Sequence, residues 1–416
     1  MSCKKLRLIY LLTTTICYSI AFGQSTWPSL SWANSVNLSV IMPVNATELS
    51  GLYWNNALNR LYIVGDAGSV TVLQLNKSSH QFSLLGFAEN IGGPEGITQT
   101  NNLAEEFYTI DENSYEIRKY MFNSNFNAAT KLKSWNLLQS PSPMTNSDNT
   151  GPEGIAFVPD WYLQKSGFKS TVSGQIYVSK KGMGGLMFIA HQDEGYVWVF
   201  DVNPTVNNDF AYVGKYKTNR SESCDLSFDN STGLLYILHN VSDNYLEVTD
   251  LHTSVSNSEY KFNIIKEYFI PNPASGSNNI EGLAISPKFP DVATQNVWLC
   301  RDVTKDSEIT DAIKWFSPFS GEGTNLQTDI RLPSTDSNII IQQYSDKIIL
   351  KNTNVESLNN RMNVHVYDAL GKSVFKKLDT NLPCIITLKN TNSGIYFITI
   401  SEQNNQSQVL KFIKFQ

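Results

Sequence analysis

Short apolar segments recur along residues 48–305, each followed by a turn and then by a second apolar segment. The second segments are aromatic and β-branched at successive positions, as in LYIV, FYTI, LMFIA, LLYIL and VWLC. The turns are rich in Asn, Asp, Gly and Pro, for example WNNALN and FDNSTG. Third segments follow in SVTVLQL, SYEIRKYMF, GYVWVFDV and NYLEVTDL. Runs of three or four strands without helical periodicity between them predict an all-β domain.

The first strand of each unit carries a repeated motif, which reads PEGI, PEGIAF and IEGLAI in three copies. Five copies align on one key position, at spacings of 45, 58, 71 and 57 residues. The key residues are Gly51, Gly96, Gly154, Asp225 and Gly282. Repetition at this period is typical of propellers, whose blades are buried on both faces, which explains the consecutive apolar positions. We expect a β-propeller, with a large β-sandwich as the alternative.

The number of blades depends on two segments. The long third spacing contains SGQIYVSKKGMGGLMFIAHQDEGYVWVF, which is either one blade with a hairpin insertion or parts of two blades. The N-terminal segment NLSVIMPV would close the ring as an outer strand. We expect six blades, with five as the alternative.

The pattern changes near Pro333. From Ser334 onward the chain reads as short strands with turns every 8 to 12 residues, which predicts a small Ig-like β-sandwich of about 80 residues. This segment has nine Lys and Arg against six Asp and Glu. We therefore divide the chain into a propeller domain at residues 24–333 and a C-terminal domain at residues 334–416.

The C-terminal segment resembles a known export domain. VHVYDALGKSVFKK (364–377), SGIYFITI (393–400) and KFIKF (411–415) look like the type A C-terminal sorting domain of the type IX secretion system of Bacteroidetes-type bacteria. The resemblance implies that residues 334–416 engage the type IX machinery and direct the chain through the outer membrane. It also implies removal of this domain, followed by release or attachment at the cell surface. A carbohydrate-binding or adhesive sandwich is the alternative.

The first 23 residues have the pattern of a secretory signal peptide. Lys4, Lys5 and Arg7 precede an apolar run, and small residues precede Gln24. A membrane anchor is the alternative, but the run is short and interrupted by Thr and Ser. No later segment is long and apolar enough to cross a membrane, so we expect none in the mature chain.

Charge and cysteine content narrow the function further. The chain has 32 Lys and Arg against 38 Asp and Glu, a net charge of −6, and loss of the three basic leader residues makes it −9. That balance argues against a nucleic-acid binder. The mature chain would keep only Cys224, Cys300 and Cys384, which are too far apart for a disulfide framework or a zinc motif and read as isolated buried thiols.

The residue before the key position forms a ring if the fold is a propeller, because first strands line the central channel. These residues are Ser50, Glu95, Glu153, Cys224 and Glu281. In the fourth unit the acid comes one place later, at Asp225. Gathered carboxylates are costly unless a cation joins them or one is protonated, and oxygen-rich sites suit Ca²⁺. Glu95, Glu153, Asp225 and Glu281 are therefore candidate ligands of a metal or a cationic substrate.

The motif also has a purely structural interpretation. Each carboxylate would alternatively cap backbone N–H groups of the adjacent blade. The glycines suit a crowded axis, where neighbouring backbones approach closely.

A second set of candidates lies at the ends of the second strands. Three positions after the aromatic residue of each unit stand Gly65, Asp111, His191, His239 and Arg301. One position further stand Asp66, Glu112, Gln192, Asn240 and Asp302. Histidine serves as a general base or metal ligand, and arginine binds carboxylate or phosphate. We take His191, His239, Arg301 and Asp111 as candidate catalytic residues, on the assumption that this alignment holds.

The repeated units also resemble the SdiA-regulated and phytase-esterase-like group of bacterial propellers. PEGI, PEGIAF, CDLSFDNSTGLLYIL and IEGLAISP carry the resemblance, over most of residues 48–305. It implies a Ca²⁺-dependent or metal-supported central pocket and hydrolysis of a phosphate or carboxylate ester. Cys224 departs from the pattern where a glutamate would stand, and no G-x-S-x-G, H-E-x-x-H or P-loop motif occurs.

Two function classes follow from these observations. One is an exported binding or adhesion propeller whose acidic site takes a metal or a small ligand. The other is a metal-supported esterase or phosphoesterase. They differ in whether the histidines lie beside the ring carboxylates in one site.

Overall fold

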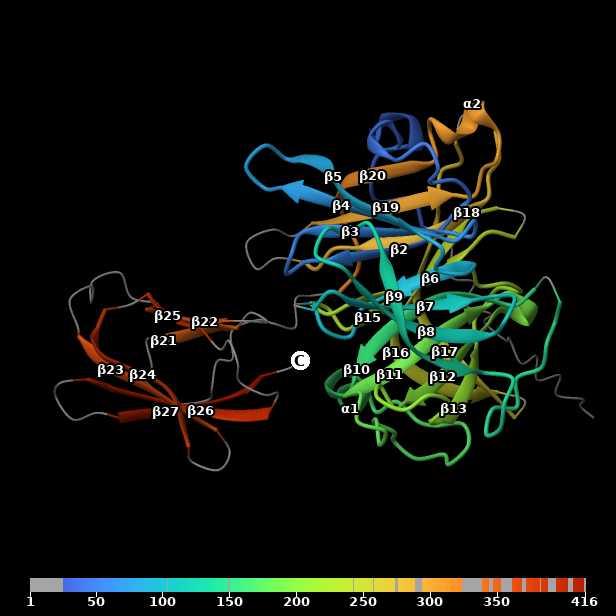
Figure 1. Ribbon diagram of the computed structural model, residues 1–416. Coiled ribbons are helices and arrows are strands. Elements are labelled where there is room, and N and C mark those ends of the chain that lie inside the picture. Colours follow the sequence, from blue (N-terminus) through green and yellow to red (C-terminus); the bar gives the residue numbers. More distant parts are fainter. Residues whose placement is uncertain are drawn as a thin grey trace, which may run out of the picture.

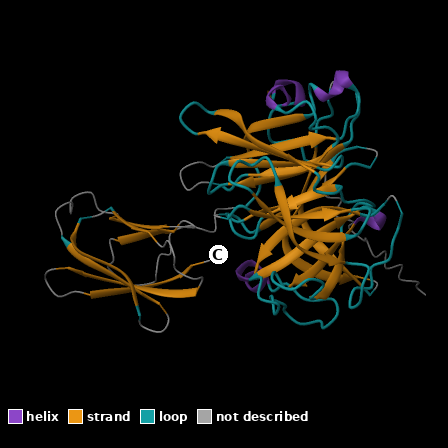
Figure 2. Cartoon of the chain, viewed as in Figure 1, coloured by secondary structure: helices purple, strands orange, loops and turns teal. Residues whose placement is uncertain are grey.

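The computed structural model describes most of the chain in two stretches, and strands dominate both (Figures 1 and 2). Residues 25–323 are described except 103, 149, 242, 257, 274–275 and 289–293. Residues 339–414 are described except 344–346, 353–360, 369–371, 382, 388–393 and 403–406. The predicted signal peptide and the predicted domain boundary at 333/334 lie outside these residues. The expected all-β class is confirmed.

Residues 25–323 form five four-stranded units, the blades of a β-propeller. Blade 1 comprises β2 (Leu49–Asn55), β3 (Arg60–Gly65), β4 (Ser69–Asn76) and β5 (Gln81–Glu89). Blade 2 comprises β6 (Pro94–Thr98), β7 (Glu106–Asp111), β8 (Glu116–Phe122) and β9 (Ala129–Asn136). Blade 3 comprises β10 (Pro152–Pro159), β11 (Gly185–His191), β12 (Tyr196–Val202) and β13 (Phe210–Lys217).

The last two blades follow the same antiparallel plan. Blade 4 comprises β14 (Asp225–Asp229), β15 (Leu234–His239), β16 (Tyr245–Ser256) and β17 (Glu259–Phe269). Blade 5 comprises β18 (Ile280–Ile285), β19 (Gln295–Arg301), β20 (Ile313–Phe319) and the N-terminal β1 (Val36–Asn37). The short helices are η1 (Trp32–Asn34), η2 (Ser39–Ile41), α1 (Asp160–Ser166), η3 (Asp193–Gly195) and α2 (Asp306–Ile309).

The five blades close into a ring. First strands contact one another in the order β2, β6, β10, β14, β18 and back to β2. Within the described residues, one apolar core lies between each pair of neighbouring blades. Strand β3 shows why the sequence has consecutive apolar positions. Leu61 and Ile63 pack towards blade 5, while Tyr62 and Val64 pack towards blade 2, and all four are at most 1% exposed.

The expectation of six blades is therefore wrong, and the alternative of five is correct for residues 25–323. The long third spacing is one blade with an insertion, which contains α1 and the loop up to Gly185. An N-terminal strand does close the ring, as expected. It pairs at Val36 and Asn37 with Trp315 and Lys314 of β20, and so includes only the first residue of the segment, 37–44, that we expected to do so.

Blades 3 and 4 also join at their outer strands. A parallel bridge between Lys217 and Lys261 makes one continuous sheet, in the order β10-β11-β12-β13-β17-β16-β15-β14. Strands β16 and β17 are the longest of the propeller among the described residues, because their hairpin extends past the blade as far as Ser256 and Glu259. This seam places segments of two blades side by side on the rim.

The C-terminal stretch forms the expected two-sheet sandwich. One sheet contains β21 (Ile339–Gln343), β22 (Lys347–Asn352) and β25 (Cys384–Thr387). The other contains β24 (Ser373–Thr380), β23 (Met362–Asp368), β26 (Gly394–Glu402) and β27 (Ser407–Lys414). Ile348 and Leu350 of the first sheet pack against Val364 and Ile398 of the second. Cys224, Cys300 and Cys384 are free and buried, as predicted.

Candidate functional site

The ring residues stand at β-bulges in four of the five blades. In blade 2 the pairing of β6 with β7 shifts between Pro94 and Gly96, at Glu95. Blades 1, 3 and 5 have the same shift, at Ser50, Glu153 and Glu281. A bulge inserts one extra residue and re-aims its side chain. The repeated E-G dipeptide is therefore a bulge that turns a carboxylate out of the ladder.

Blade 4 carries its acid one position later. Strand β14 begins at Asp225, so Cys224 lies just outside it; the Cys224 amide donates to the Leu238 carbonyl at 2.9 Å, and Leu238 is also the partner of Asp225. Cys224 packs in the apolar core between blades 4 and 5, where it is 2% exposed. Asp225 then takes the key position that glycine occupies in the other blades.

The key positions crowd around the propeller axis. A Cβ atom added to Gly96 would lie 2.6 Å from the Ile155 nitrogen, and one added to Gly154 would lie 2.5 Å from the Asp225 Cα. Such distances leave no room for a side chain, so glycine is required where neighbouring first strands meet. The expectation of close backbone approach at the axis is confirmed.

Among the five key positions, Asp225 alone has a side chain, and its carboxylate forms a hydrogen bond to a neighbouring blade. Its carboxylate accepts the Leu283 amide of blade 5 (2.7 Å) and its neighbour Leu226 (2.8 Å). Burial raises its pKa well above the usual range, while the amides of Leu283, Leu226 and Leu52 act in the opposite direction. For Asp225 the structure therefore supports the capping alternative, in which an acid satisfies backbone N–H groups of an adjacent blade.

The three glutamates influence one another electrostatically. Glu95 and Glu153 are 6% and 5% exposed, and Glu281 is partly buried. Burial raises the pKa of Glu95 to about 9 and that of Glu281 to about 8. The pKa of Glu153 is raised well above its usual range, by burial and then by the charge of Glu95. These carboxylates thus form one electrostatic group at the end of the ring.

A second ring of acids faces the first. Asp66, Glu112 and Asp302 directly follow the second strands of blades 1, 2 and 5. The charge of Asp66 contributes to the raised pKa of Glu95, that of Glu112 to Glu153 and that of Asp302 to Glu281. Asp66 is exposed, whereas Glu112 and Asp302 are partly buried. We call these three residues together with Glu95, Glu153 and Glu281 the acidic mouth.

Neutral side chains fix two of the glutamates. The Ser50 hydroxyl donates to Glu95 Oε2 at 2.6 Å, and Asn279 Nδ2 donates to Glu281 Oε1 at 2.5 Å. Asn240 Nδ2 in turn donates to Asn279 Oδ1 at 2.9 Å. Asn279 was not a sequence candidate, although its place just before the motif in SNNIEG could have indicated it.

The side chains of the acidic mouth are not arranged as a metal-coordination site. Within the described residues, no group of three or more His, Cys, Asp and Glu side chains is arranged to hold a metal ion. Glu95, Glu153 and Glu281 belong to one group. Asp225 is 1% exposed, and its carboxylate oxygens accept hydrogen bonds from backbone amides. The four predicted ligands are thus near one another without converging on a single point.

The predicted catalytic residues occupy the expected repeat positions, since each is the last residue of its second strand. Asp111 is engaged within blade 2. Its carboxylate accepts the Gly93 amide (3.0 Å), the Ser114 hydroxyl (2.7 Å) and the Arg118 guanidinium. These contacts tie a turn to its own blade, so the structure gives Asp111 a local role.

His191 is buried between aromatic rings at the interface of blades 2 and 3. Its ring centroid lies 6.2 Å from that of Tyr115 and 6.1 Å from that of Trp198. Its Nδ1 accepts the Asp193 amide at 3.1 Å, and burial lowers its pKa to about 4. The imidazole is therefore neutral at pH 7 and packed among core residues.

His239 and Arg301 bond to groups outside the acidic mouth. His239 Nδ1 contacts the Glu222 carbonyl, and its Nε2 lies 3.5 Å from Glu247 Oε2. Arg301 is 2% exposed and donates to the Ser277 carbonyl at 3.0 Å and the Asp311 carbonyl at 3.2 Å. The structure brings the predicted acids together, but it gives each predicted catalytic residue contacts of its own.

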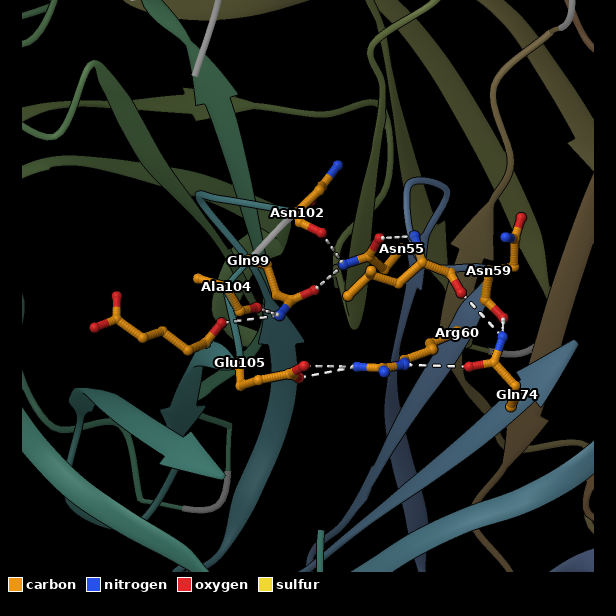
Figure 3. Close-up of polar contacts among 10 residues, drawn as sticks. Asn55, Asn59, Arg60, Gln74, Gln99, Asn102, Ala104 and Glu105 are labelled. Carbon is orange, nitrogen blue, oxygen red and sulfur yellow. Dashed lines mark hydrogen bonds and ion pairs between the residues drawn. The ribbon is translucent and has the colours of Figure 1, made fainter. Parts of the chain in front are cut away.

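At the end of blades 1 and 2 that lies opposite the acidic mouth, the polar side chains pair with one another through amide hydrogen bonds and an ion pair (Figure 3). Asn55 Nδ2 donates to Gln99 Oε1 at 2.7 Å and to the Asn102 carbonyl at 3.0 Å. Arg60 Nη1 donates to both oxygens of Glu105, at 3.0 and 2.9 Å. Here a carboxylate is neutralised by a guanidinium, whereas at the acidic mouth the leading charges acting on Glu153 are other carboxylates.

Comparison with known proteins assigns the C-terminal part. Residues 344–414 match the family described as secretion system C-terminal sorting domain, Por_Secre_tail. This domain indicates export by type IX secretion to the cell surface or the extracellular space, through interaction with the type IX machinery. The protein is therefore an exported, β-rich type IX substrate. The described residues include no helix of the length and apolarity that crossing a membrane requires.

The remaining comparisons give no activity. No curated protein matches the chain. Among solved structures, the chain is similar to that of Saccharomyces cerevisiae Sqt1, at 9% identity over 86% of this chain and 82% of that chain, with a TM-score of 0.29. A likeness at that score carries no argument. The resemblance of the propeller to the SdiA-regulated and phytase-esterase-like group stays a prediction.

Proposed function

We propose that the protein is an exported binding propeller whose acidic mouth takes a ligand bearing an organic cation, such as an ammonium or guanidinium group. The observation that carries the proposal is the grouping of Glu95, Glu153 and Glu281 with Asp66, Glu112 and Asp302, whose charges add to burial in raising the pKa values of the three glutamates. With pKa values of about 9 and 8, Glu95 and Glu281 keep their protons at pH 7. A bound organic cation favours their ionised forms, because its charge offsets their repulsion and their loss of hydration.

The gradient of exposure supports entry of such a group from solvent. Asp66 is exposed, Glu112 and Asp302 are partly buried, and Glu95 and Glu153 are buried. Carboxylates that extend from exposed to buried positions attract cations and raise their association rate. A flat or tetrahedral organic cation can bond to several separated carboxylates, so it does not need the common point that a metal ion needs.

Calcium is the alternative ligand and hydrolysis the alternative activity. Oxygen donors at the mouth suit Ca²⁺ chemically, but the absence of a three-ligand group among the described residues favours the organic cation. A hydrolase of the expected kind would use His191 or His239 next to the ring. Their contacts with Asp193, Glu222 and Glu247 do not favour that role.

Calorimetric titration of the exported chain tests the proposal. Butylammonium and butylguanidinium are the probes, butanol is the uncharged control, and CaCl₂ is a separate arm. We expect binding of at least one organic cation, no binding of butanol, and at least tenfold weaker binding in Glu153→Gln. Glu105→Gln is the matched control, because Glu105 is an interblade carboxylate at the other end of the blades.

The separate titrations distinguish an organic-cation site from a calcium site and from a hydrolase. Binding of CaCl₂ alone, lost in Glu153→Gln, would replace the organic cation by a metal. Turnover of an ester or phosphoester that depends on His191 or His239 would establish the hydrolase. Equal behaviour of wild type and Glu153→Gln towards every cation would refute a binding role for the acidic mouth.

A further inference from the structure

A small hairpin in the blade 3 insertion presents apolar side chains to solvent. It follows α1, and Lys169 pairs with Ile176 across it. The Ser170 hydroxyl and the Thr171 amide both donate to the Val213 carbonyl of β13, at 2.6 and 3.1 Å, which fixes the hairpin to the outermost strand of the blade. Val172 is 65% exposed and Ile176 is 56% exposed. The hairpin is thus fixed to the blade, with Val172 exposed in its turn and Ile176 exposed at its base.

The extended hairpin of β16 and β17 adjoins it across the seam between blades 3 and 4. Val255 is 60% exposed near the tip of that hairpin and pairs with Tyr260. A Cβ atom on Gly174 of the first hairpin would lie 3.8 Å from the Tyr260 hydroxyl, so the two tips are neighbours. We call Val172, Ile176 and Val255 the rim patch.

Exposed lysines border the rim patch. Lys165, Lys169 and Lys180 bracket the first hairpin in sequence, and all three are exposed. Lys261 of the second hairpin is 41% exposed and lies 3.6 Å from Glu259. Residues 165–180 therefore carry three exposed lysines and no acid, whereas the second tip has Glu259, whose partner Tyr196 also lies under the charges of the exposed Asp193 and Glu194.

The carboxylates beneath the first hairpin are used internally. Asp160 accepts the Ser179 amide at 2.7 Å. Asp201 is fully buried and accepts the Ser179 hydroxyl at 2.8 Å and the Lys180 amide at 2.6 Å. Asp201 is buried and Asp160 is partly buried, and both carboxylates accept amides of the loop after the hairpin, whereas Lys169 and Lys180 are exposed.

We propose that the rim patch docks the protein on an anionic lipid surface. Apolar residues at protruding tips insert into the boundary between headgroups and acyl chains, and flanking lysines stay with the anionic headgroups. The positive border is notable on a chain of net charge −6, because a generally acidic protein is otherwise repelled from such a surface. Protruding tips suit a lipid surface better than a protein partner, which would bury them in a complementary pocket. This inference is independent of the acidic mouth.

Sedimentation of the full exported chain with vesicles tests the inference. The probes are vesicles of phosphatidylglycerol mixed with phosphatidylcholine, and vesicles of phosphatidylcholine alone. We expect binding to the anionic vesicles that is weakened at least tenfold by the double change Val172→Asp with Ile176→Asp. We expect a similar loss with Lys169→Glu and Lys180→Glu, and weaker binding of wild type at high salt because exposed charges are screened.

Matched controls lie elsewhere on the propeller. Val44→Asp changes a valine that is 87% exposed outside the rim patch, and Lys77→Glu changes an exposed lysine of blade 1. Both should bind as wild type does. The variant Val172→Ser with Ile176→Ser guards against misfolding and should also lose binding at an unchanged melting temperature. Equal binding to both vesicle types, no binding by wild type, or full binding by the aspartate variant would overturn the inference.

Discussion

The Ser50 hydroxyl donates a 2.6 Å hydrogen bond to Glu95 Oε2, and the two residues hold the same repeat position in neighbouring blades. In blade 1, a hydroxyl that donates a hydrogen bond therefore stands where blades 2, 3 and 5 have a carboxylate. That exchange gives Glu95 a fixed orientation and limits the number of carboxylates that must share the axis. A further glutamate at residue 50 would instead add repulsion.

Stability should fall as the pH rises from about 5 to 9. The folded-state pKa values of Glu95 (about 9) and Glu281 (about 8) lie above the ordinary value of 4.5, so the unfolded chain releases protons that the folded chain retains. Their contribution to stability is complete below the ordinary pKa and is lost as the pH passes the folded values. Melting temperatures measured across this range in Glu153→Gln should depend less on pH, and a parallel curve for wild type and variant would contradict this account.

Asp225→Ala should destabilise the propeller by roughly 2–4 kcal/mol, because it leaves two buried amides without acceptors. The Leu283 amide, at 2.7 Å from the carboxylate, belongs to another blade, so the loss weakens the ring itself. Asp225→Asn retains one acceptor oxygen and should cost less than half as much. Denaturant unfolding of the two variants measures the difference, and equal losses would show that volume, not hydrogen bonding, sets the effect.

Asp311 should be needed for ring closure. It accepts the Trp32 indole N–H at 2.8 Å and contacts Lys314 and, at 3.5 Å, Arg301. Removing its side chain takes a carboxylate away from two buried cations, but the loss should be roughly 2–3 kcal/mol, below that of a fully buried pair, because Asp311 is 35% exposed. Asp311→Ala should lower the unfolding midpoint and make the segment around Trp32 accessible to protease. Unchanged protease resistance would argue against this closing role.

His191→Phe should leave cation binding unchanged. The imidazole is neutral at pH 7, because burial lowers its pKa to about 4, and a phenyl ring can retain the contacts with Tyr115 and Trp198. Titration with the same organic cations measures the effect, with Glu281→Gln as the variant expected to weaken binding. A clear loss of affinity in His191→Phe would place the histidine in the site after all.

Removal of residues 344–414 should block export. These residues match the sorting domain family, and the sandwich they form holds its own apolar core, including Leu350 and Val364. Its loss should leave the propeller inside the cell envelope without changing its fold. Cell fractionation with detection of residues 25–323 measures this, and secretion at the wild-type level would contradict the assigned route.

Much of the fold could be predicted because it depends on the order of apolar and polar residues along short segments. Strand β3 alternates its side chains between two apolar cores, so its four central positions are apolar, and this is visible as LYIV in the sequence. The order of strands and turns therefore follows from periodicity. The blade count does not, because whether residues 160–184 add a blade or only an insertion depends on where β12 pairs.

The candidate site divides in the same way. Repetition of the motif determines that Glu95, Glu153 and Glu281 occupy equivalent places, and the sequence alone is enough to find them. Only the tertiary structure decides that bulges aim them at a common mouth, that Asp225 caps backbone amides instead, and that His191 packs into a core. The physical reason is that strand pairing and blade packing set the direction of each side chain, and both depend on residues far away in the sequence.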